Sequence, residues 1–281
     1  MLTAEGMEDA LAGDRPDGIL GEFHDWLAGV VEREDSDLHV KVGAPPKVRT
    51  AAGVLTSLDR SPLAPEETAA IADAIVPADR RGRFEAAGEI DFAYSIPHVG
   101  RFRVNAFRQR GAVSIVLRRL RFGGPTFDEL GLPGVVRTLA EEPRGLVLVT
   151  GPTGSGKTTT LSAMIEHLNR GKQVHIVTIE DPIEVLFRDD QASINQREVG
   201  TDTESFLSAL RAALRQDPDV ILIGEMRDTE TVRAALQAAE TGHLVLSTLH
   251  TVDATETVNR VVDFFPPHQQ QQIRFTLAGA L

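Results

Sequence analysis

The segment GPTGSGKT at residues 151–158 limits the folds open to this chain more than any other feature of its sequence. It follows the apolar run LVLVT at 146–150 and precedes a stretch with helical spacing, which is the context that a phosphate-binding P-loop requires. Glycines let such a loop turn its backbone N–H groups toward phosphate, and the helix start adds a positive dipole end. We therefore predict an ATP-binding loop made of Gly151, Pro152, Thr153, Gly154, Ser155, Gly156, Lys157 and Thr158.

Two side chains of this loop have specific expected roles. Lys157 should reach the β- and γ-phosphates, and the hydroxyl of Thr158 should bind Mg²⁺. Beyond the loop, apolar residues repeat with the spacing of one buried helix face, at Leu161, Met164, Ile165 and Leu168. The sequence thus predicts a helix that begins inside the loop.

Four short apolar runs, with helical segments between them, predict the core of the second half of the chain. They lie at 146–150, 174–179, 220–223 and 243–247. Short apolar strands that alternate with helices are typical of a parallel sheet covered on both faces, with ligands bound at the carboxyl ends of its strands. We therefore expect an α/β fold with its site at that edge.

Two acidic residues follow strands of this expected sheet. Glu180 comes directly after 174–179, and Glu225 follows 220–223 after one glycine, in a pattern that resembles a Walker B element with Glu in the usual Asp position. Hydrolysis of a phosphate anhydride needs a group that activates water and an acidic contact to the metal. We predict that Glu180 is the base and that Glu225 contacts Mg²⁺ or its hydration shell, and the reverse assignment stays open. Asp228 is instead expected to cap a helix over 229–240.

Two histidines flank the last expected strand. His243 precedes it and His250 follows it, so that His250 should lie beside the γ-phosphate, where an imidazole donates a hydrogen bond or senses charge. A zinc site built on these two histidines is the competing interpretation. No third ligand is evident and the chain has no cysteine, so the sequence favours the phosphate role.

The first part of the chain has a different pattern. Residues 1–16 lack periodicity and are predicted to be a flexible tail, and residues 17–120 are predicted to form a small α+β domain. Its expected helices lie at 18–33 and 66–76, and its expected strands at 38–42, 89–96, 101–107 and 112–120. The Gly- and Pro-containing stretch 121–133 is predicted to be a linker, and residues 134–281 to be the ATPase domain.

Charge and composition exclude several classes of function. The formal net charge of -12 argues against a surface that binds nucleic acid, because such domains are usually basic. Without cysteine there is neither a disulfide framework nor a thiolate zinc site. No apolar run approaches the ~18 residues of a membrane span, so we expect a cytoplasmic protein that does not insert into the membrane directly.

Five blocks of sequence together resemble the ATPases of type IV pili and type II secretion. The blocks are SDLHVKVGAPP, GPTGSGKTTTL, TIEDPIE, NQREVG and ALRAALRQDPDVILIGEMRDTETVRAALQAAETGHLVLSTLHT. Within this family they are most similar to the PilT-like retraction ATPases. The resemblance implies a PAS-like N-terminal domain joined to a RecA-like P-loop NTPase domain. It also implies a homohexameric ring at the inner face of the cell membrane, beneath a platform protein of the pilus machinery.

The resemblance also assigns roles to individual residues. It implies that Glu180 and Glu225 are the catalytic acids and that His243 and His250 belong to the family's His box. It further implies that the segment GRFRVNAFRQR at 100–110 sends arginines toward ATP, with Arg101 and Arg103 as the expected ones. The alternation in this segment agrees, because Arg101 and Arg103 are placed on the face of a strand opposite to its apolar residues.

Several alternatives stay open. Pilus assembly or type II secretion would use the same chemistry, although the ATPases of those systems commonly have a tetracysteine zinc insert that this chain lacks. The chain also stops at Leu281, where retraction ATPases normally continue, so we expect the C-terminal helices to be incomplete. Two further hypotheses are a RecA-like nucleic-acid motor and a nucleotide-binding module that does not hydrolyse ATP. The chain has a single Trp and a single Tyr for base stacking, which disfavours the nucleic-acid motor.

Overall fold

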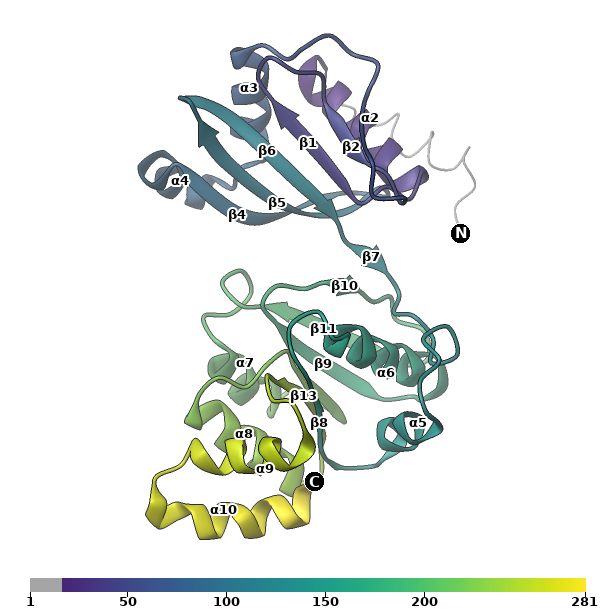
Figure 1. Ribbon diagram of the computed structural model, residues 1–281, viewed down its shortest axis with the longest axis vertical. Coiled ribbons are helices and arrows are strands. Elements are labelled where there is room, and N and C mark those ends of the chain that lie inside the picture. The colour runs from purple at the N-terminus through teal and green to yellow at the C-terminus, as the bar shows by residue number, and fades with distance from the viewer. Residues whose placement is uncertain (1–16) are drawn as a thin grey trace. The chain divides into compact units, whose positions relative to one another are not determined.

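The computed structural model describes residues 17–281, and the predicted tail at residues 1–16 lies outside the described residues. The chain forms two compact units that divide between Leu120 and Arg121 (Figure 1). The first unit has one sheet and one apolar core, and the larger sheet of the second unit is parallel, with an apolar core on each face. In residues 17–281 no helix is long and apolar enough to cross a membrane.

The first unit is built on a six-stranded antiparallel sheet with the order β3-β2-β1-β6-β5-β4. Its strands are β1 (Asp37–Lys41), β2 (Lys47–Arg49), β3 (Leu55–Ser57), β4 (Glu89–Ile96), β5 (Gly100–Gln109) and β6 (Ala112–Arg119). The four strands predicted from the sequence are all present. The sequence did not predict β2 and β3, because runs of three residues are too short to show a period.

Two long helices of the first unit pack on this sheet. They are α2 (Ile19–Glu32) and α3 (Pro65–Ile75), and η1 (Ala78–Arg80) and the short α4 (Arg81–Ala87) follow them. In α2 the apolar side chains Phe23, Leu27 and Val30 are fully buried in the core that the sheet completes, as the helical spacing predicts.

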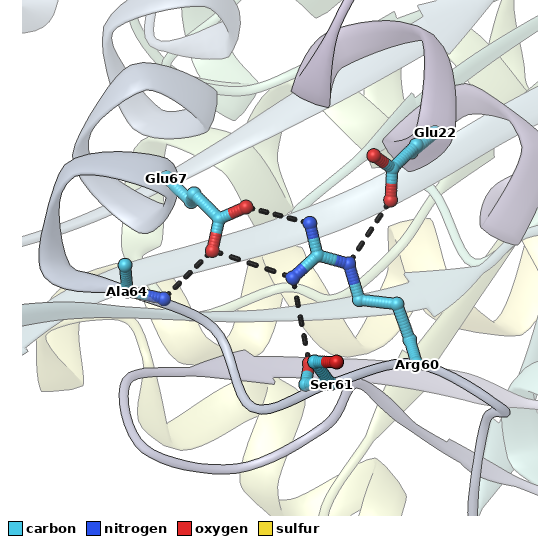
Figure 2. Close-up of polar contacts among 5 residues, drawn as sticks. All are labelled: Glu22, Arg60, Ser61, Ala64 and Glu67. Atoms are coloured by element: carbon cyan, nitrogen blue, oxygen red, sulfur yellow. Dashed lines mark hydrogen bonds and ion pairs between the residues drawn. The ribbon is translucent and has the colours of Figure 1, made fainter.

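Arg60 joins the two helices from the loop that precedes α3, as Figure 2 shows. Its Nε donates to Glu22 of α2 at 3.0 Å, and its two terminal nitrogens donate to Glu67 of α3 at 2.6 and 3.3 Å. Glu67 in turn accepts a hydrogen bond from the backbone N–H of Ala64 at 2.7 Å, which caps α3. The Arg60 hydrogen bonds hold the pKa of Glu67 below its ordinary value.

The second unit contains a five-stranded parallel sheet with the order β11-β9-β12-β13-β8. Its strands are β8 (Gly145–Thr150), β9 (His175–Glu180), β11 (Ser193–Glu198), β12 (Val220–Ile223) and β13 (Leu244–Leu249). The predicted α/β fold class is therefore confirmed, with the parallel sheet in the unit that contains the P-loop.

Helices cover both faces of the parallel sheet (Figure 1). On one face α5 (Gly134–Glu141) and α6 (Lys157–Gly171) form a core with the sheet, and on the other α7 (Phe206–Ala213), α8 (Thr229–Glu240), α9 (Ala254–Asp263) and α10 (Pro267–Ala280) form a second core. Residues of β12 alternate between them, since Val220 and Leu222 face the first core while Ile221 and Ile223 face the second. This explains why the strand is apolar throughout.

The stretch 121–133, expected to be a linker, is folded onto the second unit. Its first residues form β7 (Arg121–Phe122), which pairs in parallel with β10 (Val185–Leu186). The backbone N–H of Gly124 donates to the Glu166 carboxylate of α6 at 3.2 Å, and Phe127 is buried in the core beneath that helix. The glycines here allow close packing on α6 rather than flexibility, and sequence composition does not distinguish these two uses.

Candidate functional site

The loop at 151–158 connects β8 to α6 as the sequence predicts. Gly156 has a φ of 93° and ends the loop in the left-handed region, which glycine adopts without a steric penalty. Gly151 has a φ of 150°, which residues with a side chain rarely adopt, and a Cβ atom there would lie 2.5 Å from the hydroxyl oxygen of Ser155, so this turn favours glycine. In α6 the four residues predicted to form the buried face, Leu161, Met164, Ile165 and Leu168, are all buried.

A pocket of about 430 Å³ lies beside this loop, entirely within the second unit. Its walls come from the carboxyl ends of the parallel strands, where the sequence placed the site. The pocket brings together Lys157 and Thr158 of the loop with Glu180, Glu225 and His250. Its apolar wall includes Phe187, Phe206 and Leu222.

Glu180, the last residue of β9, is almost completely buried at the pocket. Its Oε1 accepts hydrogen bonds from the hydroxyl of Thr178 at 2.6 Å and from the amide of Gln196 at 3.1 Å. Burial raises the pKa of this carboxyl, and the two hydrogen bonds act in the opposite direction. A carboxylate with a raised pKa is a stronger base, which is what the activation of water requires.

Glu225 stands just beyond the end of β12 and is mostly buried. It pairs with Arg227, whose pKa this contact raises further, and its Oε2 lies 3.6 Å from Nε2 of His250. Asp228 caps α8 as predicted, since its carboxylate accepts from the backbone N–H of Thr231 at 2.8 Å. In the loop after β12, Glu225 therefore lines the pocket and Asp228 caps α8.

His243, unlike His250, does not line this pocket. It precedes β13 at the amino end, whereas the pocket lies at the carboxyl ends of the strands. A strand of six residues spans roughly 20 Å, since each residue adds about 3.3 Å. The His243 Nδ1 lies 2.9 Å from the carbonyl oxygen of Ala238, so within its own chain it has a structural contact that spacing alone does not reveal.

Arg101 and Arg103 lie on β5 of the first unit. The predicted alternation is present, because Phe102 and Val104 are fully buried while Arg103 is exposed and Arg101 is half-buried. The two arginines therefore have the orientation on the strand that the sequence predicted. Their role toward ATP stays a prediction.

Sequence reasoning missed the residues that hold Glu180. Thr178 and Gln196 stand opposite each other on β9 and β11, and both donate to the same carboxylate oxygen. Gln196 lies within the NQREVG block, which was noted only as part of the resemblance. The available signal was Thr178, a polar residue within the predicted strand 174–179, whereas the strand that holds Gln196 was not predicted.

The pocket residues fit a magnesium ion. The hydroxyl of Thr158 and the carboxylate of Glu225 line the same pocket and are hard oxygen ligands, which Mg²⁺ prefers. Within residues 17–281 no group of three His, Asp or Glu side chains is placed to hold a metal by itself. A site with few protein ligands suits Mg²⁺, because this ion usually keeps several water ligands and also binds the phosphates of the substrate.

Comparison with known proteins gives one consistent family. The model of the type II/IV secretion system proteins matches residues 54–280. The type IV pilus retraction ATPase PilT of Pseudomonas aeruginosa is 48% identical over 92% of this chain and 75% of its own length. A twitching motility protein of Neisseria gonorrhoeae is 45% identical over 82% of this chain and 61% of its own length.

A solved structure agrees with these sequence relatives. The crystal structure of the pilus retraction motor PilT with bound ADP superposes with a TM-score of 0.84 at 50% identity, and the match covers 92% of this chain and 75% of that one. The family model covers most of the chain, and the two sequence relatives are identical to it at nearly half of the aligned residues. The chain therefore belongs to the type II/IV secretion system protein family.

Proposed function

We propose that this chain is an ATPase that binds Mg-ATP in the pocket at 151–158 and powers the retraction of type IV pili as a homohexamer. One observation supports the chemistry above all: the P-loop lysine and two carboxylates converge on a single pocket at the carboxyl ends of parallel strands. The retraction assignment is supported by the similarity to PilT and to the solved retraction motor with bound ADP.

Each pocket residue has a proposed task. The loop N–H groups and Lys157 bind the phosphates, and Glu180 accepts the proton of the water that attacks the γ-phosphorus, so that ADP and phosphate are formed. Glu225 and Thr158 would hold Mg²⁺, which neutralises charge on the phosphates. His250 lies beside Glu225 and would respond to the charge of the γ-phosphate.

Three further residues with proposed roles, Arg101, Arg103 and His243, do not line this pocket in the single chain. Arg101 and Arg103 would deliver positive charge to the γ-phosphate and couple the first unit to hydrolysis. His243 is a His-box residue with a contact of its own at Ala238. The proposed partners are five further copies of the chain and a platform protein of the inner membrane, which would place the ring at the cytoplasmic face of that membrane.

Steady-state ATPase activity of the purified chain tests the chemistry. We expect Glu225→Gln to retain nucleotide binding while kcat falls on the order of 100-fold, because one carboxylate contact to the metal or water is lost. Glu240→Gln removes an exposed carboxylate from α8 and is the matched control, with wild-type activity expected. An inactive wild-type chain, or a Glu225→Gln variant with wild-type kcat, contradicts the assignment.

The biological output needs a separate measurement. Replacing the gene in its own organism with the Glu225→Gln form should leave pili assembled on the surface and abolish twitching. Loss of surface pili with the same variant would instead identify an assembly motor. Particle mass in the presence of a non-hydrolysable ATP analogue tests the hexamer, and a monomer at all concentrations would contradict it.

A further inference from the structure

Gln196 makes three hydrogen bonds that join three segments of the second unit. Its Nε2 donates to Oε1 of Glu180 at 3.1 Å and to the carbonyl oxygen of Val185 at 2.8 Å. Its Oε1 accepts from the backbone N–H of Phe187 at 2.8 Å. One side chain on β11 thus connects the proposed base at the end of β9 to the backbone on both sides of Leu186 in β10.

The amide suits these contacts better than any other side chain of its size. Glu180 and the carbonyl of Val185 both need a donor, while the N–H of Phe187 needs an acceptor, and a primary amide offers two N–H groups and one carbonyl. This pattern also fixes the orientation of the amide, because the flipped arrangement would set oxygen against two acceptors. A glutamate at this position would satisfy Phe187 alone.

β10 is itself attached to the chain that enters the second unit. It pairs in parallel with β7, and the backbone N–H of Gly123 donates to the carbonyl oxygen of Leu186 at 2.7 Å. Only four residues separate Glu180 from the first residue of β10. β7 is therefore linked to the Glu180 carboxylate through its pairing with β10 and through the Gln196 amide.

We propose that Gln196 is a positioning residue that holds the Glu180 carboxylate toward the nucleotide pocket and fixes it to the β7–β10 pair. The proposal rests on the proposed function, because it takes Glu180 as the base of ATP hydrolysis. It adds to that function a second residue for orienting the base and a path by which the segment after the first unit bears on catalysis.

The full chain with Gln196→Met tests this proposal, because Met keeps the length of the side chain and removes the amide. We expect kcat to fall about tenfold with the KM for ATP changed by less than about twofold, since the loss of one hydrogen bond to a charged group affects the base and leaves the P-loop intact. Gln237→Met, on the exposed face of α8, is the control and should hydrolyse ATP as the wild type does.

The pH profile distinguishes positioning from general loss of structure. Gln196 favours the charged form of Glu180, so its loss should move the acid limb of kcat to higher pH. Gln196→Glu retains the acceptor for Phe187 and adds a like charge, and it should move that limb further in the same direction. An acid limb at the wild-type pH in both variants, or a wild-type kcat in Gln196→Met, overturns the proposal.

Hydrogen exchange separates this inference from the proposed function. In Gln196→Met the amide hydrogen of Phe187 loses its acceptor, and its exchange should accelerate at least about tenfold whether or not ATP is turned over. If Glu180→Gln hydrolysed ATP at the wild-type rate, Glu180 would not be the base, and the exchange result would still decide whether Gln196 fixes β10. Unchanged exchange at Phe187 would contradict the proposal that Gln196 fixes β10.

Discussion

The Nζ of Lys157 lies 2.9 Å from the carbonyl oxygen of Gly151, at the other end of the same loop. A second carbonyl, that of Pro152, lies 3.0 Å from it. The ammonium group is therefore already desolvated in part and directed across the loop that the nucleotide would occupy. Phosphate oxygens, which are charged, are better acceptors than these neutral carbonyls and would replace them.

We expect Lys157→Ala to abolish hydrolysis and to weaken ATP binding by at least about 10-fold, because it removes both a phosphate contact and the cation that organises the loop. Titration with a fluorescent ATP analogue measures the binding. Lys172→Ala is the control, since Lys172 follows the far end of α6 and its Nζ donates to the carbonyl of Glu141. Equal affinities for the two variants would contradict the location of the phosphate site.

Glu180→Gln should stabilise the folded chain at pH 8 in the absence of nucleotide. The pKa of this buried carboxyl is raised, so the folded state binds its proton more tightly than the unfolded state does. The stabilisation from this group is complete below the ordinary pKa of glutamate, near 4.3, and is lost as pH rises through the folded pKa. A glutamine at this position does not ionise, so the variant does not lose this stability as pH rises. Thermal unfolding followed upward from the ordinary pKa of glutamate should show the advantage of Gln growing with pH, and a difference that is constant at every pH would contradict the assignment.

Arg60→Ala should destabilise the first unit by about 1 kcal/mol, because it removes a partly buried guanidinium that bridges α2 and α3. The pKa of Glu67 is lowered, so the contribution of this pair is complete above the ordinary pKa of glutamate and is lost as pH falls through the lowered value. Denaturant unfolding at neutral pH measures the change. Arg83→Ala, on exposed α4, should have little effect, and equal losses in both variants would contradict the bridge.

Gly124→Ala should destabilise the second unit by about 1–3 kcal/mol, since the new Cβ would lie 2.4 Å from the carbonyl oxygen of Ser162 in α6. Gly134→Ala is the matched control, because a Cβ there meets nothing within 4 Å and alanine favours the helix that Gly134 begins. The midpoint temperatures of thermal unfolding of the two variants measure this difference. A neutral Gly124→Ala would show that the segment 121–133 is not packed closely on α6.

The sequence predicted the features that depend on local pattern. The P-loop between strand and helix, the buried face of α6, the acids at two strand ends and the cap at Asp228 all follow from spacing within a few residues. The antiparallel strands β4, β5 and β6 were also predicted from local pattern, as β-type runs between turn residues.

Features that depend on contacts between distant segments could not be predicted. The pairing of β7 with β10 joins residues more than sixty positions apart, and two-residue strands have no detectable period. The role of Gln196 depends on the register of β11 against β9, which places it beside Thr178.

The uniform apolar character of β12 means that side-chain burial does not define its register. A slip of one residue would exchange the residues that face the two cores, and Val, Ile and Leu would remain buried on either side. Polar contacts at the ends of the strand must therefore set it. Asp219 provides them at the amino end, where its backbone N–H donates to the carbonyl of His175 and its carboxylate accepts from the N–H of His175. The depth at which Glu225 enters the pocket thus depends on polar contacts at both ends of β12, with Asp219 at the amino end and, at the other end, the backbone N–H of Gly224 donating to the carbonyl of Ile179.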